Sequence, residues 1–202
     1  MKAILGKKIG NSQIFQGDSI IGITLLEVGP CKVTQVKTKE KDGYDAVQLG
    51  FEDLGKNKIG KSQKGKEFRY LTEFRIQKSP GDATQYAQGT VIDASVLAEG
   101  DKVTISAISK GKGFQGAVRR YKVKARVASH GVKHEHRTIG SIGSSFPERV
   151  VPGKKMPGRM GGERVTVKNL KVVKIDKEHN LVALEGAVPG KNGTVVEISS
   201  QS

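Results

Sequence analysis

Residues 102–120 read KVTISAISKGKGFQGAVRR, and the chemistry of the chain changes within this stretch. The first seven residues mostly alternate polar and apolar side chains, which is the pattern of a strand with one face on a core. From residue 109 onward lysine and glycine replace that alternation, and no acidic residue occurs between Lys110 and Arg126. The stretch therefore marks a boundary between a β-rich body and a basic segment of another kind.

The net charge of the 202-residue chain is +15, and most of it lies beyond that boundary. Residues 109–164 hold 14 Lys and Arg against 3 Glu, whereas the other 146 residues hold 21 basic and 17 acidic side chains. A concentrated positive field attracts polyanions, so nucleic acid is the leading class of partner.

The body of the chain has the pattern of short β-strands. β-Branched runs, several of them alternating, occur at residues 20–28, 32–38, 46–51, 102–108, 165–175, 181–184 and 194–198. Turn signals separate them, and such spacing is typical of a small barrel or sandwich. A short helix is expected over residues 94–98, with Asp93 as its N-cap and Gly100 just past its end. The strands before residue 55 and after residue 164 are expected to belong to one sheet system, from which the basic segment projects.

Residues 121–162 show neither a helical nor a strand period, and glycine recurs through them. So long a segment without secondary structure is usually functional or disordered. Its charge suits a segment that is ordered by threading into folded RNA. We expect residues 122–162 to be disordered in the free protein.

Residues 109–120, SKGKGFQGAVRR, carry the most specific signal for phosphate binding. Alternating Lys-Gly pairs allow the backbone to approach a phosphate while the ammonium groups neutralise it. Phe114, Val118 and Tyr121 have the spacing of one face of a short helix, which predicts a packing stripe. Arg119, Arg120 and Lys122 would then point away from that stripe.

Residues 55–62, GKNKIGKS, match the phosphate-loop pattern of nucleotide-binding proteins. That pattern needs a following helix whose N-terminus faces the phosphates. Here QKGKE follows, with a glycine and no apolar face, so a solvated or RNA-facing basic loop is the favoured interpretation. A phosphate-loop NTPase remains the alternative, and magnesium-dependent ATP or GTP binding would distinguish the two.

Three histidines, His130, His134 and His136, cluster with Glu135. Zinc sites hold typically four ligands rigidly, and these donors lie among lysines and glycines, so no metal is expected. No serine elbow or other catalytic set can be assembled. The sequence therefore predicts neither an enzyme nor a cofactor nor a small-molecule substrate.

The compartment follows from cysteine usage and hydropathy. Cys31 is the single cysteine, which suits a reducing compartment. The N-terminus lacks the apolar core of a signal peptide, and no apolar run is long enough to span a bilayer. We expect a soluble cytoplasmic protein without a membrane partner.

The ordered motifs along the chain resemble the bacterial form of the large-subunit ribosomal protein L3 family. They are ILGKKIG, QIF, VTQVK, DGY, AVQLGF, SKGKGFQGAVRR, HG at 130, HR at 136, GSIG at 140, GKKMPGRMG at 153, ERVTVKNLKVV, NL and GAVPG. Their agreement in order over nearly the whole length is more specific than any one of them.

The resemblance implies a mainly β chain: a translation-factor-like β-barrel with an inserted α+β region and a long, basic, largely irregular extension. It implies direct binding of large-subunit rRNA, an early role in subunit assembly, neighbouring ribosomal proteins as partners, and an extension that reaches toward the peptidyl transferase centre. The candidate rRNA-binding residues are the basic side chains Lys110, Lys112, Arg119, Arg120, Lys122, Lys124, Arg126, His130, Lys133, His136, Arg137, Arg149, Lys154, Lys155, Arg159 and Arg164.

The expected division of the chain has four parts. Residues 1–60 form the first part of the barrel and residues 61–108 the inserted α+β region. Residues 109–164 form the extension, and residues 165–202 complete the barrel. Net charge alone would also fit a free-standing basic nucleic-acid-binding protein, which predicts similar affinity for duplex DNA and rRNA.

One departure from the family pattern concerns the extension. Some bacterial members carry a methylated glutamine after GSIG, whereas Ser144-Ser145-Phe146-Pro147 follows here and no glutamine occurs between residues 116 and 200. That modification is therefore not expected in this chain.

Overall fold

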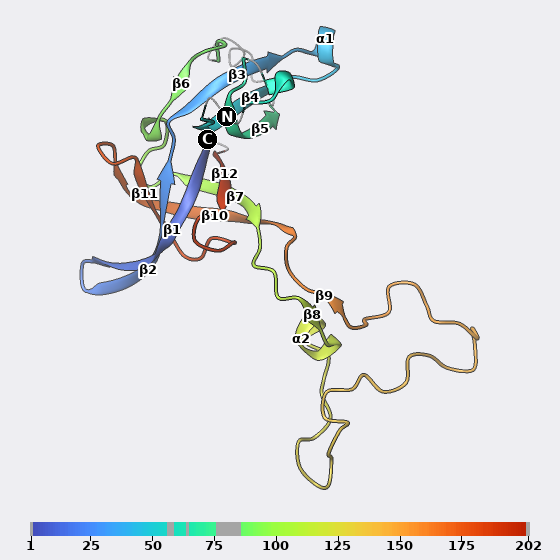
Figure 1. The fold of residues 1–202 in the computed structure, drawn as a ribbon. Helices are drawn as coiled ribbons and strands as arrows, with labels where there is room; N and C mark the ends of the chain where they lie inside the picture. The colour runs from blue at the N-terminus through green and yellow to red at the C-terminus, as the bar shows by residue number, and fades with distance from the viewer. Residues whose placement is uncertain (1, 56–58, 64, 76–85, 201–202) are drawn as a thin grey trace. The chain divides into compact units, whose positions relative to one another are not determined.

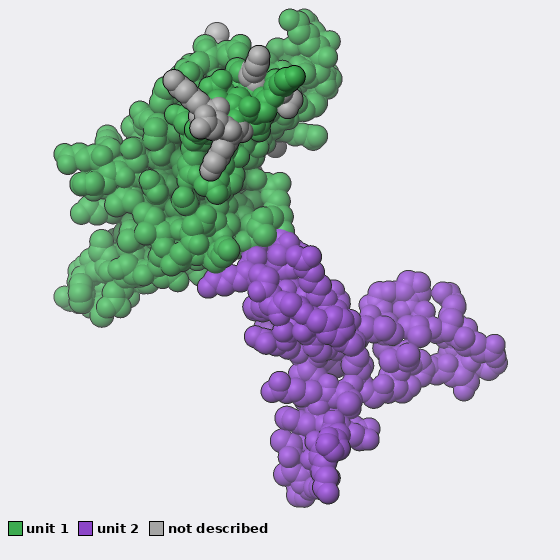
Figure 2. Space-filling model, viewed as in Figure 1, with its two compact units in different colours: residues 1–108, 164–202 green, residues 109–163 purple. Residues whose placement is uncertain are grey.

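The computed structural model describes residues 2–55, 59–63, 65–75 and 86–200. It divides the chain into two compact units, residues 1–108 with 164–202 and residues 109–163, which are coloured separately in Figure 2. We refer to them as the barrel unit and the extension. No helix in the described part of the chain is long and apolar enough to cross a membrane.

Six antiparallel strands of the barrel unit form a closed barrel (Figure 1). Each strand is hydrogen-bonded on both sides, in the order β1-β12-β7-β10-β11-β2, and β2 returns to β1. Closure leaves no unpaired sheet edge along the paired segments. The strands are β1 (Lys2–Gln16), β2 (Ser19–Val28), β7 (Lys102–Ile108), β10 (Arg164–Asp176), β11 (Leu181–Glu185) and β12 (Val195–Ser200).

Alternation along the strands places apolar side chains inside the barrel. On β7, Val103 and Ile105 are fully buried and Ala107 is nearly so, while the residues between them are half-buried. Ile198 on β12 lies opposite Ile105 and is also fully buried. The period of two that predicted these strands is therefore the period that fills the core.

The chain leaves the barrel after β2 to form a second sheet, in the order β5-β4-β3-β6. This sheet shares one apolar core with the barrel, since Val33, Leu49 and Phe51 pack in the same cluster as Leu5 and Val28. Its strands are β3 (Cys31–Lys37), β4 (Ala46–Asp53), β5 (Phe68–Arg75) and β6 (Val91–Ile92), and the helix α1 (Lys39–Asp42) joins β3 to β4.

The prediction of a mainly β chain is confirmed, and the seven predicted runs coincide with β2, β3, β4, β7, β10, β11 and β12. The strands β1, β5 and β6 were not predicted. The sheet memberships do not follow the expected boundary at residue 60, because β3 and β4 pair with β5 and β6 and not with barrel strands. Residues 61–108 likewise contribute β5 and β6 to one sheet and β7 to the other. Local patterns specify strands, whereas their partners depend on contacts between distant parts of the chain.

The helix expected over residues 94–98 is a single 3₁₀ turn, η4 (Ala94–Val96). Asp93 has the extended backbone of an N-cap but makes no capping hydrogen bond with its side chain. Leu97 already returns to extended geometry. Without a cap, and with extended backbone at both ends, the segment does not continue as an α-helix.

The extension has little regular structure. Its strands β8 (Phe114–Gln115) and β9 (Gly158–Arg159) form a two-residue ladder, followed along the chain from β8 by the helix α2 (Ala117–Tyr121). Residues 122–157, all of them described, contain turns and bends but no helix or strand. No apolar cluster of the barrel's size therefore holds this segment together.

Candidate nucleic-acid interface

Two neighbouring chain segments form the base of the extension, which we call the stem (residues 109–115 and 158–163). The amide of Ser109 donates to the carbonyl of Glu163 at 2.8 Å, and that of Lys112 donates to Met160 O at 2.9 Å. Met160 N in turn donates to Gly113 O at 2.9 Å. These bonds satisfy backbone groups on both segments and position the first lysines of the basic run.

One stem glycine is required by the approach of the two segments. Gly161 has φ +74°, and a Cβ there would lie 2.1 Å from the carbonyl oxygen of Lys110. Gly111, in the Lys-Gly pairs, has open space around the position of a Cβ. Only the second kind of glycine leaves backbone free to approach a ligand, which the predicted role of the Lys-Gly pairs requires.

The predicted packing stripe on α2 is wrong. Phe114 lies on β8 and is 76% exposed, and Tyr121 is also exposed. Ala117 is the buried residue of this segment. The helix begins only at Ala117, so helical spacing does not relate Phe114 to Val118.

Arg120 is held within the extension. Its Nη1 donates to the carbonyl of Met156 at 3.1 Å, and its guanidinium lies 4.8 Å from the centre of the Tyr121 ring. The neighbouring Arg119 donates from Nη1 to Gln115 Oε1 at 3.0 Å and is exposed. Arg120 therefore braces the stem-proximal part of the extension, whereas Arg119 presents its charge to solvent.

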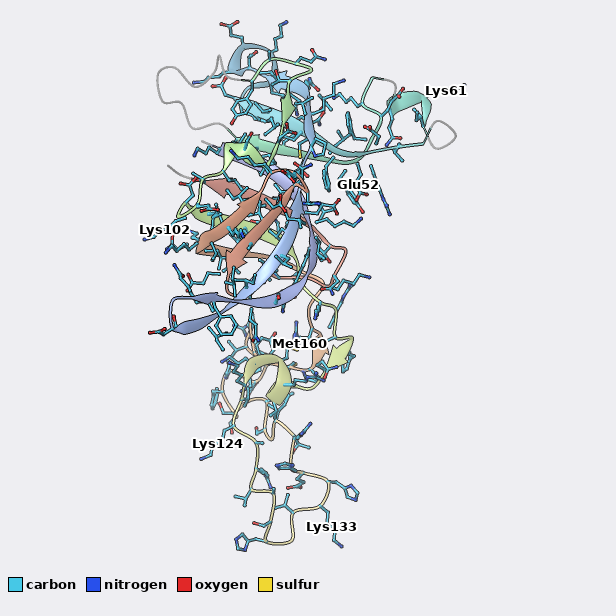
Figure 3. All side chains as sticks on the ribbon, turned by 90° about the vertical axis from the view of Figure 1, so that its left-hand side faces the viewer. Glu52, Lys61, Lys102, Lys124, Lys133 and Met160 are labelled. Carbon is cyan, nitrogen blue, oxygen red and sulfur yellow. The ribbon has the colours of Figure 1, made fainter. Side chains whose placement is uncertain are left out.

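A smaller loop closes on itself between residues 126 and 136. The amide of Arg126 donates to His136 O at 3.1 Å, and the Arg126 guanidinium forms an ion pair with Glu135. Lys133 lies within this loop and points away from the ribbon in Figure 3, as does Lys124 before it. The charge of Arg126 is thus partly compensated within the protein, while the lysine charges are not.

Most of the predicted site residues are exposed. Arg120 and His136 are half-buried, and the exposed ones are Lys110, Lys112, Arg119, Lys122, Lys124, Arg126, His130, Lys133, Arg137, Arg149, Lys154, Lys155, Arg159 and Arg164. Among the residues that the structure describes, ion pairs of this group are those of Arg126 and Arg164. The remaining cations are brought into one unit without acidic partners.

Arg164 differs from the other candidates because it begins β10 and belongs to the barrel unit. It forms an ion pair with Glu197 of β12. Burial raises the pKa of the Glu197 carboxyl above its ordinary value, and the charge of Arg164 opposes that rise. Arg164 therefore has a partner in the protein before any RNA is present.

The sequence offered two other candidate sites, a metal site at the histidine cluster and a phosphate loop at GKNKIGKS. Within the described ranges, no group of three or more His, Cys, Asp or Glu lies close enough to hold a metal. Of GKNKIGKS, residues 56–58 lie outside the described residues; Lys61–Gln63 forms the 3₁₀ turn η2, and the strand β5 follows at Phe68. No described helix therefore stands where a phosphate-loop fold needs one.

Comparison with known proteins decides the family. A family model for ribosomal protein L3 matches residues 76–186. The chain is 47% identical to the large ribosomal subunit protein uL3 of Desulfitobacterium hafniense, over 94% of this chain and 91% of that protein. This chain belongs to the ribosomal protein L3 family. It is also 43% identical to uL3 of Petrotoga mobilis, over 98% and 94% of the two chains, and 44% identical to uL3 of Thermosipho melanesiensis, over 99% and 98%.

The barrel of this L3-family chain carries lysines that were not among the candidate residues predicted from the sequence. Lys102 on β7 lies directly opposite Lys171 on β10, and both side chains are exposed. Lys168 and Lys174 are exposed further along β10. Like charges directly opposite each other on neighbouring strands are destabilising. An anion bound near both ammonium groups would offset this repulsion. The signal in the sequence was the recurrence of lysine every three residues in VKNLKVVK, which the near balance of charge over the whole body obscured.

Proposed function

We propose that this chain is a structural constituent of the large ribosomal subunit and binds its 23S-type rRNA directly through the extension. The observation that carries the proposal is the set of exposed cations on residues 109–163, most of them without an acidic partner. Lys110 and Lys112 in the stem and Arg119 on α2 are the first of these contacts. The relatives are named as large ribosomal subunit proteins, which supports the same assignment.

The physical basis is neutralisation of crowded phosphates. Folded rRNA brings phosphates close together, and each protein cation that replaces condensed counterions releases them into solution. A segment without a core of its own can follow an RNA surface, because it has no fold to lose. Few aromatic rings are available for base stacking, so recognition rests on RNA shape and phosphate position.

The family also implies an early role in subunit assembly, contacts with neighbouring ribosomal proteins, and an extension that reaches toward the peptidyl transferase centre. The division of the chain supports these proposals, since a compact barrel unit carries the extension as a separate unit. The barrel is proposed to be of the translation-factor type and to anchor the extension through its lysines, including Lys102 and Lys171. The protein has no catalytic step of its own in this role.

Sedimentation of a cell lysate tests the assignment. We expect the chain in stoichiometric amount in the large subunit and retained at moderate salt. A chain found mainly free, or bound to DNA, would support the free-standing nucleic-acid-binding alternative. Comparable affinity of the purified chain for duplex DNA and protein-free rRNA would support that alternative too.

A salt titration tests the two stem lysines together with Arg119 of α2. The triple variant Lys110→Gln, Lys112→Gln, Arg119→Gln should bind large-subunit rRNA with a shallower dependence of log affinity on log salt, by about 0.7 to 0.9 per lost phosphate contact. The control, which removes two charges instead of three, is Lys39→Gln, Lys41→Gln in α1, whose lysines are exposed but interleaved with Glu40 and Asp42. An equal loss of slope per removed charge in both variants would show that net charge, and not the position of these cations, sets the affinity.

A further inference from the structure

The β1–β2 hairpin extends beyond the barrel as a two-stranded ribbon (Figure 1). Pairing of β1 with β12 covers Lys2–Lys7, and pairing of β2 with β11 begins at Ile23. Farther out, from Gln13 to Gln16 and from Ser19 to Gly22, the ladder joins the two strands to each other, and at its base the amide of Gly186 donates to Gly22 O at 2.9 Å. We call this part the hairpin tip. An isolated two-stranded ribbon is marginally stable in water, so a partner would help to hold it.

One face of the hairpin tip is apolar and uncovered. Phe15 lies directly opposite Ile20, which places both side chains on the same face, and they are 72% and 57% exposed. The next pair on that face is Gln13 with Gly22, and a Cβ at Gly22 would meet open space. The opposite face differs, because Ile14 and Ile21 are half-buried.

The charge of the hairpin tip sets it apart from the rest of the chain. No Lys, Arg or His occurs from Ile9 to Cys31, although the chain holds 35 Lys and Arg. Asp18, in the turn, is the only charged residue of residues 9–26. Cations supply most of the affinity of a protein for phosphates, so this surface is poorly suited to an RNA backbone. An uncharged apolar centre with an aromatic side chain is instead the composition of the centre of a protein interface.

We infer that the hairpin tip is a docking surface for another protein of the large subunit, with Phe15 and Ile20 as the anchoring side chains. The complementary surface is an apolar pocket with a lysine or arginine beside it to meet Asp18. The inference rests on the proposed function, because it takes the partner from the same subunit. The basic extension and the uncharged hairpin tip would then have different partners: the extension binds RNA and the hairpin tip binds protein.

Photocrosslinking within the cell tests the inference. p-Benzoylphenylalanine replaces Phe15 in one full-length chain and Phe114 in another, because these two phenylalanines are almost equally exposed, at 72% and 76%, and differ in their surroundings. After irradiation, large subunits are washed in high salt and the adducts are identified by mass spectrometry. Position 15 should give an adduct with one defined subunit protein, and position 114 an adduct with rRNA.

The possible outcomes separate the two proposals. An rRNA adduct at position 15, adducts with many proteins, or none there while position 114 reacts with rRNA would each overturn the docking surface. Failure of position 114 to react with rRNA would count against the proposed function, whatever position 15 shows.

A double variant gives a second measurement that does not depend on the crosslinker. Phe15→Ser, Ile20→Ser removes no core side chain, and its thermal unfolding should match that of the unchanged chain. It should bind protein-free large-subunit rRNA within about twofold of the unchanged chain. In competition with that chain in cells, we expect its share of salt-washed subunits to fall about tenfold or more, as when an interface anchor is truncated. Equal incorporation would overturn the inference.

Discussion

The basic residues of this protein differ in the contacts that their side chains make within the protein before any RNA is bound. Arg126 is paired with Glu135, and Arg120 lies against Tyr121, whereas Lys112 has no acidic partner among the described residues. Sequence identifies all three as cations in a basic run. It cannot separate them, because the distance from a guanidinium to a carboxylate is fixed by the folded backbone. Removing the unpaired Lys112 is therefore expected to cost more RNA affinity than removing Arg126.

Glu197 should give the stability of the barrel unit a defined pH dependence. Burial raises the pKa of this carboxyl above its ordinary value of 4.5, so between that value and the raised one the folded chain holds more protons than the unfolded chain. Stability therefore falls as pH rises through this window, and the loss persists above it. Glu197→Gln should remove that fall, measured by urea unfolding of the full chain at a series of pH values.

Asp101 provides a control of opposite sign. The backbone amide of Ala98 and then the ammonium group of Lys2 lower the pKa of Asp101 below its ordinary value of 3.8. Its contribution to stability is present above that value and lost as pH falls through the lowered pKa. Asp101→Asn should thus flatten only the acid side of the profile. If Glu197→Gln left the pH profile of the unchanged chain intact, the effect of burial on Glu197 would be refuted.

At the scale of elements, the stem depends on one glycine. Gly161→Ala places a Cβ in left-handed backbone and against the Lys110 carbonyl, so the two stem segments must separate. The left-handed conformation alone costs about 1–2 kcal/mol for a residue with a Cβ. We expect hydrogen-exchange protection of the Lys112 and Met160 amides to be lost. Gly111→Ala, which meets open space, should leave that protection unchanged, and equal effects of the two changes would contradict the proposed stem geometry.

An element can be predicted from sequence when the residues that determine it are close together in the chain. Strand β7 could be predicted because its alternation is contained in seven residues. The pairing of β7 with β12 could not, because those segments lie far apart in sequence and no local pattern relates them. The stripe that included Phe114 failed for a related reason, since helical spacing has meaning only after the helix has begun. The basic run at the stem was visible from the sequence alone, whereas the lysine pair of Lys102 and Lys171 required the register of two strands.

At the scale of the whole molecule, the core and the charge are assigned to different units. The apolar cluster contains no residue of 109–163, and that segment holds most of the net charge. Mutual repulsion among its cations opposes any compact state of the extension alone. The disorder expected over residues 122–162 in the free protein therefore stays a prediction for residues 122–157, whereas residues 158–162 belong to the stem, where the Met160 amide is hydrogen-bonded to Gly113 O. Amide exchange without RNA would measure the protection of both parts.

Replacing the extension by a turn tests the independence of the barrel unit. β7 and β10 pair at Ile108 and Arg164, and Ser109 donates to Glu163, so an Asn-Gly turn between Ser109 and Glu163 can close a hairpin at this point. The change removes 13 basic and 2 acidic side chains and lowers the net charge from +15 to +4. Because the apolar cluster is untouched, the thermal midpoint should stay within a few degrees of that of the full chain. Affinity for large-subunit rRNA should fall by orders of magnitude and lose most of its salt dependence. A shortened chain that unfolds would show that the extension stabilises the barrel, and one that binds rRNA with the original salt slope would move the main interface to the barrel lysines.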